Sequence, residues 1–184
     1  EQQLKQDYLD YQAYHNEWER KSAEYYSNTP NPTWDGCLAY CGENKYPGPA
    51  SPLNPMSPGV LHKSMIERIA PYTMTGVIWY QGESDDHRPG MYYKLLTQMI
   101  RNWRDDWNDD ELFFVIGQLP MHRWEADPDF KNWCTIREAQ AKTARTTAGT
   151  ALAVLTDCGE FSEIHPKDKK TPGHRFCLAA LNGC

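Results

Sequence analysis

Hydrophobic residues at the start of the chain recur at the spacing of a helix. Between residues 3 and 26 they are separated by alternating steps of three and four, which predicts an amphipathic α-helix. Its stripe consists of Leu4, Tyr8, Tyr11, Trp18 and Tyr25, with His15 and Ser22 completing it. An aromatic stripe at this spacing usually packs against a partner element, and a platform for sugar rings is the alternative interpretation.

The pattern is lost between Ser27 and Gly59, where Pro, Gly, Asn and Ser dominate, as in the run YPGPASPLNPMSPG. This composition predicts a loop throughout. A loop of this length usually has a function or a covalent restraint. We therefore expect residues 1–59 to be a helix-and-loop segment that can serve as a lid.

A regular alternation of elements follows from residue 60. Short runs that are apolar on both faces alternate with helical patterns, which indicates a parallel sheet covered by helices on both sides. The predicted helices are 60–70, 90–104, 131–146 and 172–182, and the predicted strands are 75–80, 112–118 and 150–156. Three strands are few for such a sheet, so we expect further strands upstream of Glu1, where the chain begins without Met inside a helical pattern.

Parallel strands all end at one edge of their sheet, so the loops after the three strands should be neighbours. These loops are 81–89, 119–130 and 157–171. The polar residues that they would bring together are Gln81, Glu83, Ser84, His122, Asp157, Glu160 and His165. The sequence therefore predicts a functional site at this edge.

Charge and cysteine content narrow the class of protein. The net charge of −6 leaves no basic face for nucleic acid, and no apolar run is long enough to cross a bilayer. The six cysteines show no Cys-x-x-Cys pair, so disulfides in an exported protein (secreted, periplasmic or lysosomal) are the prediction, with buried free thiols as the alternative. Those residues are Cys37, Cys41, Cys134, Cys158, Cys177 and Cys184.

His165 is the strongest candidate for chemistry at the predicted edge. Pro166 restrains its backbone, and an imidazole there can take a proton from a hydroxyl nucleophile and return it to a leaving group. The acids that could orient the ring are Glu163, Glu160 and Asp157, and the sequence does not choose among them.

Gln81 can supply a second function, because its side-chain amide can donate to a developing oxyanion while Gly82 lets the backbone turn. Glu83 could then anchor Arg137 behind the site; capping of the loop is the alternative for Gln81 and Glu83. Ser84 lacks the flanking glycines of a nucleophile elbow and is better explained as a turn residue. The histidines show no metal-ligand spacing, and no phosphate-binding glycine loop occurs, so neither metal nor cofactor is expected.

Four blocks in order resemble the sialate O-acetylesterases and related carbohydrate acetylesterases of the SGNH hydrolase superfamily. They are GVIWYQGESDD with the LHKSMIERIAPYTMTG before it, MYYKLLTQMIRNWRDDW, IREAQ, and IHPKDKKTPGHR. The resemblance implies a flavodoxin-like three-layer α/β fold, with residues 60–184 as the C-terminal part of the catalytic domain. It also implies His165 as the base and Gln81 as an oxyanion donor, with Trp79, Gly82 and Glu83 at the site.

The resemblance further implies a serine nucleophile that removes acetyl groups from sugar hydroxyls. The Gly-Gln-Ser-Asn block that carries this serine in the family does not occur in the chain, so we expect an N-terminal segment or a separate chain to supply it, and this chain alone to be inactive. Ser162 occupies the position where the superfamily often has the orienting Asp. The rival hypothesis is a carbohydrate-binding module that uses Trp34, Trp124 and Trp133.

Overall fold

The structure is a computed structural model that describes residues 1–122, 127, 129 and 131–183. The chain divides into two units, Glu1–Ile69 and Ala70–Cys184. Each unit has its own core and is considered by itself.

The first unit is organised around the predicted N-terminal helix, α1 (Gln2–Asn28). Its aromatic stripe is used for packing. Trp18 is buried against the second helix, and the Tyr11 ring stacks on His15 with centroids 5.3 Å apart. The backbone of Gly48 approaches the same tyrosine so closely that a Cβ there would lie 2.7 Å from its Cζ atom. Both neighbours restrict the Tyr11 ring, which supports packing over a sugar platform.

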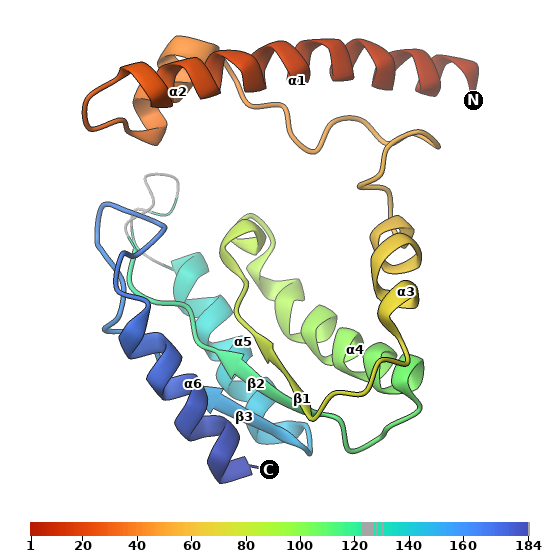
Figure 1. Ribbon diagram of the computed structural model, residues 1–184, viewed down its shortest axis with the longest axis vertical. Helices are drawn as coiled ribbons and strands as arrows, with labels where there is room; N and C mark the ends of the chain where they lie inside the picture. The colour runs from red at the N-terminus through yellow and green to blue at the C-terminus, as the bar shows by residue number, and fades with distance from the viewer. Residues whose placement is uncertain (123–126, 128, 130, 184) are drawn as a thin grey trace. The chain divides into compact units, whose positions relative to one another are not determined.

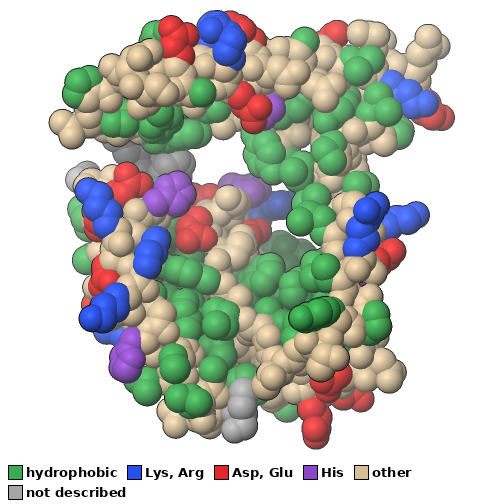
Figure 2. Space-filling view, in the orientation of Figure 1, with side chains coloured by type: hydrophobic (Ala, Val, Ile, Leu, Met, Phe, Trp, Pro, Cys, Tyr) green, Lys and Arg blue, Asp and Glu red, His purple; other side chains and the backbone are tan. Residues whose placement is uncertain are grey.

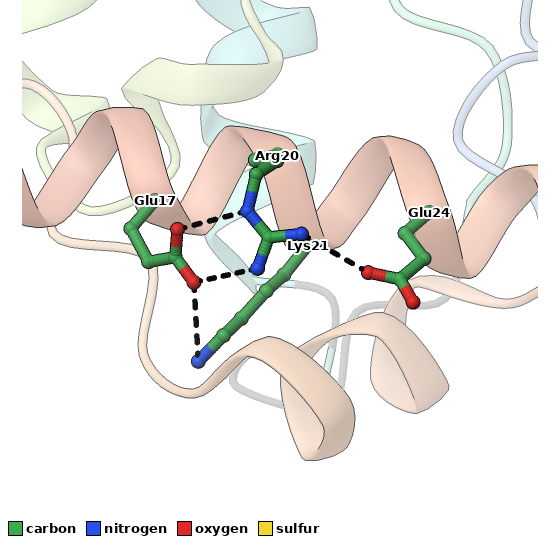
Figure 3. A network of polar contacts seen from close by, with 4 residues as sticks. All are labelled: Glu17, Arg20, Lys21 and Glu24. Carbon is green, nitrogen blue, oxygen red and sulfur yellow. Dashed lines mark hydrogen bonds and ion pairs between the residues drawn. The ribbon is translucent and has the colours of Figure 1, made fainter.

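The opposite face of α1 carries a chain of ion pairs (Figure 3). Arg20 pairs with Glu17 at 2.8 Å and with Glu24 at 3.3 Å, and Lys21 lies 4.0 Å from Glu17. All four side chains are at least 40% exposed, so these pairs support the helix only weakly.

The prediction of a loop throughout 27–59 is wrong at α2 (Trp34–Cys41). Thr33 caps this helix, because its side chain accepts a hydrogen bond from the Gly36 N–H at 3.1 Å. The helix then buries Cys37 and Cys41 against Trp18. Tertiary packing and a cap outweigh the loop-like composition of the segment.

The expected disulfides are not present among the described cysteines: Cys37, Cys41, Cys134, Cys158 and Cys177 are free thiols, and Cys184 lies outside the described residues. Cys37 and Cys41 occupy neighbouring turns of α2 with their Sγ atoms 3.7 Å apart. Both act as small hydrophobic core residues. Export to an oxidising compartment stays a prediction.

The predicted helix at 60–70 forms as a π-helical turn, η1 (His62–Ile66), followed by α3 (Glu67–Ile69). Beyond it, the second unit follows the predicted alternation. Its elements are β1 (Gly76–Trp79), a 3₁₀ turn η2 (Glu83–Asp85), α4 (Pro89–Trp107), β2 (Phe113–Gly117), α5 (Lys131–Thr146), β3 (Thr150–Ala153) and α6 (Lys170–Gly183).

The strands form a parallel sheet in the order β1-β2-β3. Ile78 pairs with Val115 in the first ladder, and Val115 pairs with Ala151 in the second. Helices α4 and α5 cover one face and α6 lies on the other (Figure 1). The predicted three-layer, flavodoxin-like α/β class is therefore confirmed.

Alternate residues of the strands divide between two cores, as a side-chain period of two requires. Phe114 and Ile116 of β2 pack with α4 and α5, whereas Val115 packs with Phe176 of α6. Helix α6 covers β2 and β3 but leaves Ile78 of β1 59% exposed. Figure 2 shows hydrophobic side chains across this face of the second unit, between α6 and α4.

None of the described helices is both long enough and apolar enough to cross a bilayer.

Candidate active site

The loops that follow the three strands meet, as the topology predicts. A Cβ at Gly82, after β1, would lie 3.3 Å from the Leu119 side chain that follows β2. Gly159, after β3, lies directly on the backbone of Met121, and a Cβ there would collide with the Met121 carbonyl oxygen and lie 2.7 Å from its nitrogen. The loop after β2 thus contacts both the loop after β1 and the loop after β3.

A buried glutamine joins the ends of β1 and β2. Gln140 of α5 is fully buried; its Oε1 accepts from the Leu119 N–H at 2.9 Å, and its Nε2 donates to the Gln81 carbonyl at 3.1 Å. The Tyr92 hydroxyl of α4 donates to the same carbonyl at 2.7 Å. The IREAQ block ends in Gln140, but the sequence analysis did not predict this role for it. The signal that could have found it is a glutamine on the buried face of a predicted helix.

The Gln81 side chain is held in place by its neighbour. Its Nε2 donates to Asp85 Oδ2 at 2.8 Å. An amide carries two N–H groups, so this contact fixes the group and leaves a second donor. Gly82 follows with φ of 154°, a backbone conformation that favours glycine. These features suit Gln81 to donate a hydrogen bond at the edge of the sheet.

His165 lies in the loop after β3 with its side chain 88% exposed. Glu163 contacts it twice: Oε1 accepts from the His165 backbone N–H at 3.0 Å and lies 3.6 Å from Nδ1 of the ring. Of the three acids considered from the sequence, Glu163 is the one that the structure places against this imidazole.

The other two acids have different partners. Glu160 Oε1 accepts from the Lys167 N–H at 2.8 Å. Asp157 forms a bidentate ion pair with Arg175 of α6, in which Nη2 and Oδ2 are 2.7 Å apart. Arg175 holds the pKa of Asp157 down at about 2. Glu160 and Asp157 therefore stabilise the loop after β3 and do not orient the His165 ring.

The remaining predicted residues lie around this edge. Ser84 and Glu83 belong to the turn η2. Trp79 packs edge-on against Trp103 in the core, with centroids 6.1 Å apart. Arg137 donates to the carbonyls of Leu119 and Pro120, at 2.8 and 2.6 Å, rather than forming the ion pair with Glu83 that the sequence suggested.

Among the tryptophans of the rival hypothesis, Trp133 is 2% exposed and donates through Nε1 to the Pro120 carbonyl, so its ring is not available for stacking on a sugar. Trp34 is 43% exposed, and Trp124 lies outside the described residues. Within the described part of the chain, no group of three or more His, Cys, Asp or Glu side chains is arranged to hold a metal ion.

A parallel sheet covered by helices on both faces defines the class: a three-layer α/β fold. Comparison with known proteins then narrows the class. Residues 53–166 match the family of carbohydrate esterases described as sialic acid-specific acetylesterases. The chain belongs to this family.

Individual relatives agree with the match. The chain is 27% identical to the sialate O-acetylesterase of Homo sapiens in an alignment 183 residues long that covers 86% of the chain and 34% of the human protein. The Mus musculus enzyme is 29% identical over 147 residues, covering 68% of the chain and 26% of that protein. A crystal structure of a carbohydrate acetylesterase from Xanthomonas citri superposes with a TM-score of 0.61 at 37% identity, covering 65% of the chain and 28% of that structure. The chain thus spans about a third of the length of the human relative.

Proposed function

We propose that this chain supplies the general base and one oxyanion donor of a serine-dependent carbohydrate O-acetylesterase. The observation that carries the proposal is the double contact of Glu163 with the backbone N–H and the ring of His165. A carboxylate 3.6 Å from Nδ1 favours the tautomer whose Nε2 accepts a proton, and it stabilises the imidazolium that then forms.

The reaction follows from these groups. His165 takes the proton of a serine hydroxyl as the serine oxygen attacks the acetyl carbonyl and forms a tetrahedral intermediate. The intermediate collapses when the carbon–oxygen bond to the sugar breaks, and His165 returns the proton to the departing sugar hydroxyl. Water, activated by the same imidazole, then attacks the acetyl-serine and releases acetate.

Gln81 would donate to the oxyanion of this intermediate. Its amide is held by Asp85 and its backbone by Tyr92 and Gln140, so the donor is positioned before the charge develops. Preorganised donors of this kind stabilise the transition state because they do not have to reorient during the reaction.

The serine would come from an N-terminal segment or from a separate chain. The free edge of β1 suits such a partner, because β1 lies at the end of the strand order and its Ile78 is 59% exposed beside the hydrophobic face of the sheet. A strand paired there in the parallel direction would bring its own carboxyl end to the edge that carries Gln81 and His165.

The substrate that we propose is an acetylated sugar, with the 9-O-acetyl group of a sialic acid as the first choice. The support is the family and the names of the curated relatives, which are sialate O-acetylesterases.

The test is the His165→Ala variant of the complete protein, assayed on acetylated sialic acid. His174→Ala is the matched control, because that histidine is exposed on α6. We expect kcat to fall by about 10³-fold or more for His165→Ala and to stay at the wild-type value for the control. Activity of the His165 variant within a factor of ten of wild type would refute the proposal.

A further inference from the structure

Arg137 of α5 is a charged residue for which the proposed reaction has no step. Its half-buried side chain donates twice to the backbone of the loop after β2: from Nε to the Leu119 carbonyl at 2.8 Å, and from Nη2 to the Pro120 carbonyl at 2.6 Å. Its own backbone carbonyl accepts from Gln118 Nε2 at 3.2 Å. One residue of α5 thus binds three consecutive residues of the segment that leaves β2.

The carbonyls of this segment need partners outside the sheet, because β2 ends at Gly117. Leu119 is fully buried, so its carbonyl has to be paired within the protein. A guanidinium suits the position, since its N–H groups lie in one plane and a single side chain can reach two neighbouring acceptors. The Pro120 carbonyl has a second donor in Trp133 Nε1 at 2.9 Å, so removal of the guanidinium should affect Leu119 most.

The segment that Arg137 holds is a wall for the loop that carries Gln81. A Cβ at Gly82, the next residue, would lie 3.3 Å from Leu119 Cδ1 and 3.2 Å from Ile136 Cγ2 of α5. Both distances are shorter than an optimal contact between carbon atoms. Gly82 is therefore packed between Leu119 and α5, and a shift of Leu119 would move the backbone beside Gln81.

The same segment supports the loop that carries His165. A Cβ at Gly159 would lie 2.7 Å from the Met121 nitrogen, which belongs to the same peptide group as the Pro120 carbonyl. A peptide group is rigid and planar. Because Arg137 holds the oxygen of this group, it also fixes the nitrogen on which Gly159 packs.

We propose that Arg137 is a positioning residue. It holds the segment 118–121 in place, and because the loops of Gln81 and His165 both pack on this segment, it sets the spacing of the oxyanion donor and the general base. The fixing of the segment stands on the contacts above. The consequence for turnover rests on the proposed esterase function.

Two substitutions separate the hydrogen bonds of Arg137 from its charge. Arg137→Ala removes both, whereas Arg137→Lys keeps the charge but donates from a single nitrogen and lacks the planar fork that reaches two carbonyls. Arg145→Ala is the matched control, because this arginine is exposed in the last turn of the same helix.

The first measurement needs no substrate. The complete protein is labelled with isotope-enriched glycine, and the amide signals of Gly82 and Gly159 are compared by NMR between wild type and the three variants. We expect both signals to shift in Arg137→Ala, to shift less in Arg137→Lys and to stay in place in the control. The signal of Gly149, which precedes β3 at the opposite edge of the sheet, should be unchanged in all three.

The second measurement is the turnover of an acetylated sugar by the same proteins. We expect Arg137→Ala to lower kcat by about 10- to 100-fold with KM unchanged, because displaced catalytic groups slow the chemical step. Arg137→Lys should lose less, and Arg145→Ala should keep the wild-type kcat.

Unchanged signals of Gly82 and Gly159 in Arg137→Ala would overturn the proposal, as would a wild-type kcat in a variant whose signals shift. An equal shift of Gly149 would also overturn it, because it would indicate a general loss of structure. A wild-type kcat in Arg137→Lys beside a slow Arg137→Ala would show that the charge acts rather than the hydrogen bonds, with the same consequence.

Two complications are separated by the same experiments. If Arg137→Ala does not fold, the glycine signals of Arg137→Lys decide. If the esterase hypothesis fails, His165→Ala stays active, and the glycine signals still show whether Arg137 fixes the segment 118–121.

Discussion

Replacing Gln140 by Met tests the link between the core and the candidate site. Methionine has a similar length and fills the same space, so the change removes the hydrogen bonds to Leu119 and Gln81, and a long one of 3.5 Å to Tyr92, without opening a large cavity. The Leu119 N–H then loses the acceptor that it has at 2.9 Å, inside a fully buried environment. The Gln81 carbonyl loses one donor but keeps the Tyr92 hydroxyl at 2.7 Å.

The expected loss of stability follows from these two contacts. An unsatisfied buried N–H costs about 1–3 kcal/mol, and the lost bond to Gln81, whose acceptor remains paired, costs about 0.5–1.5 kcal/mol. We therefore expect the free energy of unfolding to fall by about 1.5–4.5 kcal/mol. The measurement is urea denaturation followed by tryptophan fluorescence, with a test that the m-value is unchanged.

Gln98→Met is the matched control, because this glutamine is exposed on α4 and, within the described part of the chain, its side chain donates to its helical neighbour Asn102 at 2.7 Å. We expect the control to stay within about 0.5 kcal/mol of wild type. If Gln140→Met also stays within that range, Gln140 does not fasten the ends of β1 and β2 as described.

Two further predictions concern the loop after β3. The pKa of Asp157 is lowered to about 2 by Arg175, so the ion pair stabilises the fold above the unfolded pKa near 4 and is lost as the pH falls toward 2. Asp157→Asn should accordingly be less stable than wild type at pH 6, and the difference in urea midpoint should vanish by pH 2; a difference that is the same at both pH values would contradict this. Gly159→Ala should destabilise the protein by about 1–3 kcal/mol, because its Cβ would meet the backbone of Met121. Gly173→Ala, where a Cβ meets nothing within 4 Å in a helix, should stabilise it by about 0.5–1 kcal/mol, and thermal unfolding of the two variants should move in opposite directions.

The period of the hydrophobic pattern was enough to predict the second unit. Strands β1, β2 and β3 lie within the predicted ranges, and α5 has the predicted bounds, Lys131–Thr146. Helix α2 was missed because its buried residues, Cys37 and Cys41, are cysteines in a segment rich in glycine and proline. Neither composition nor period distinguishes buried thiols from a covalently restrained loop. The helix is stabilised by the packing of Cys37 against Trp18. These two residues are far apart in the sequence, so a hydrophobic pattern over a short stretch cannot reveal the contact.

The candidate site was predictable to the level of topology. Because parallel strands end at one edge, the sequence brought Gln81 and His165 to neighbouring loops, but it could not choose among Glu163, Glu160 and Asp157. The choice of the acid beside His165 depends on the position of Arg175 in α6. This arginine, 18 residues after Asp157 in the sequence, forms an ion pair with it. The partner of an acid is set by tertiary structure, and spacing in the sequence alone does not encode it.

The residues that hold the site in place are different from the residues proposed to carry out the chemistry. Gln81 is held through its backbone by Tyr92 and Gln140, and the loop of His165 packs through Gly159 on the backbone of Met121. The buried side chains of Tyr92 and Gln140 thus fix a backbone atom, whereas the His165 ring proposed as the base is 88% exposed. A substrate or a serine arriving from another segment can then meet preorganised groups without disturbing the core that orients them. Substitutions in the supporting layer should accordingly affect both stability and turnover, whereas substitution of His165 itself should affect turnover alone.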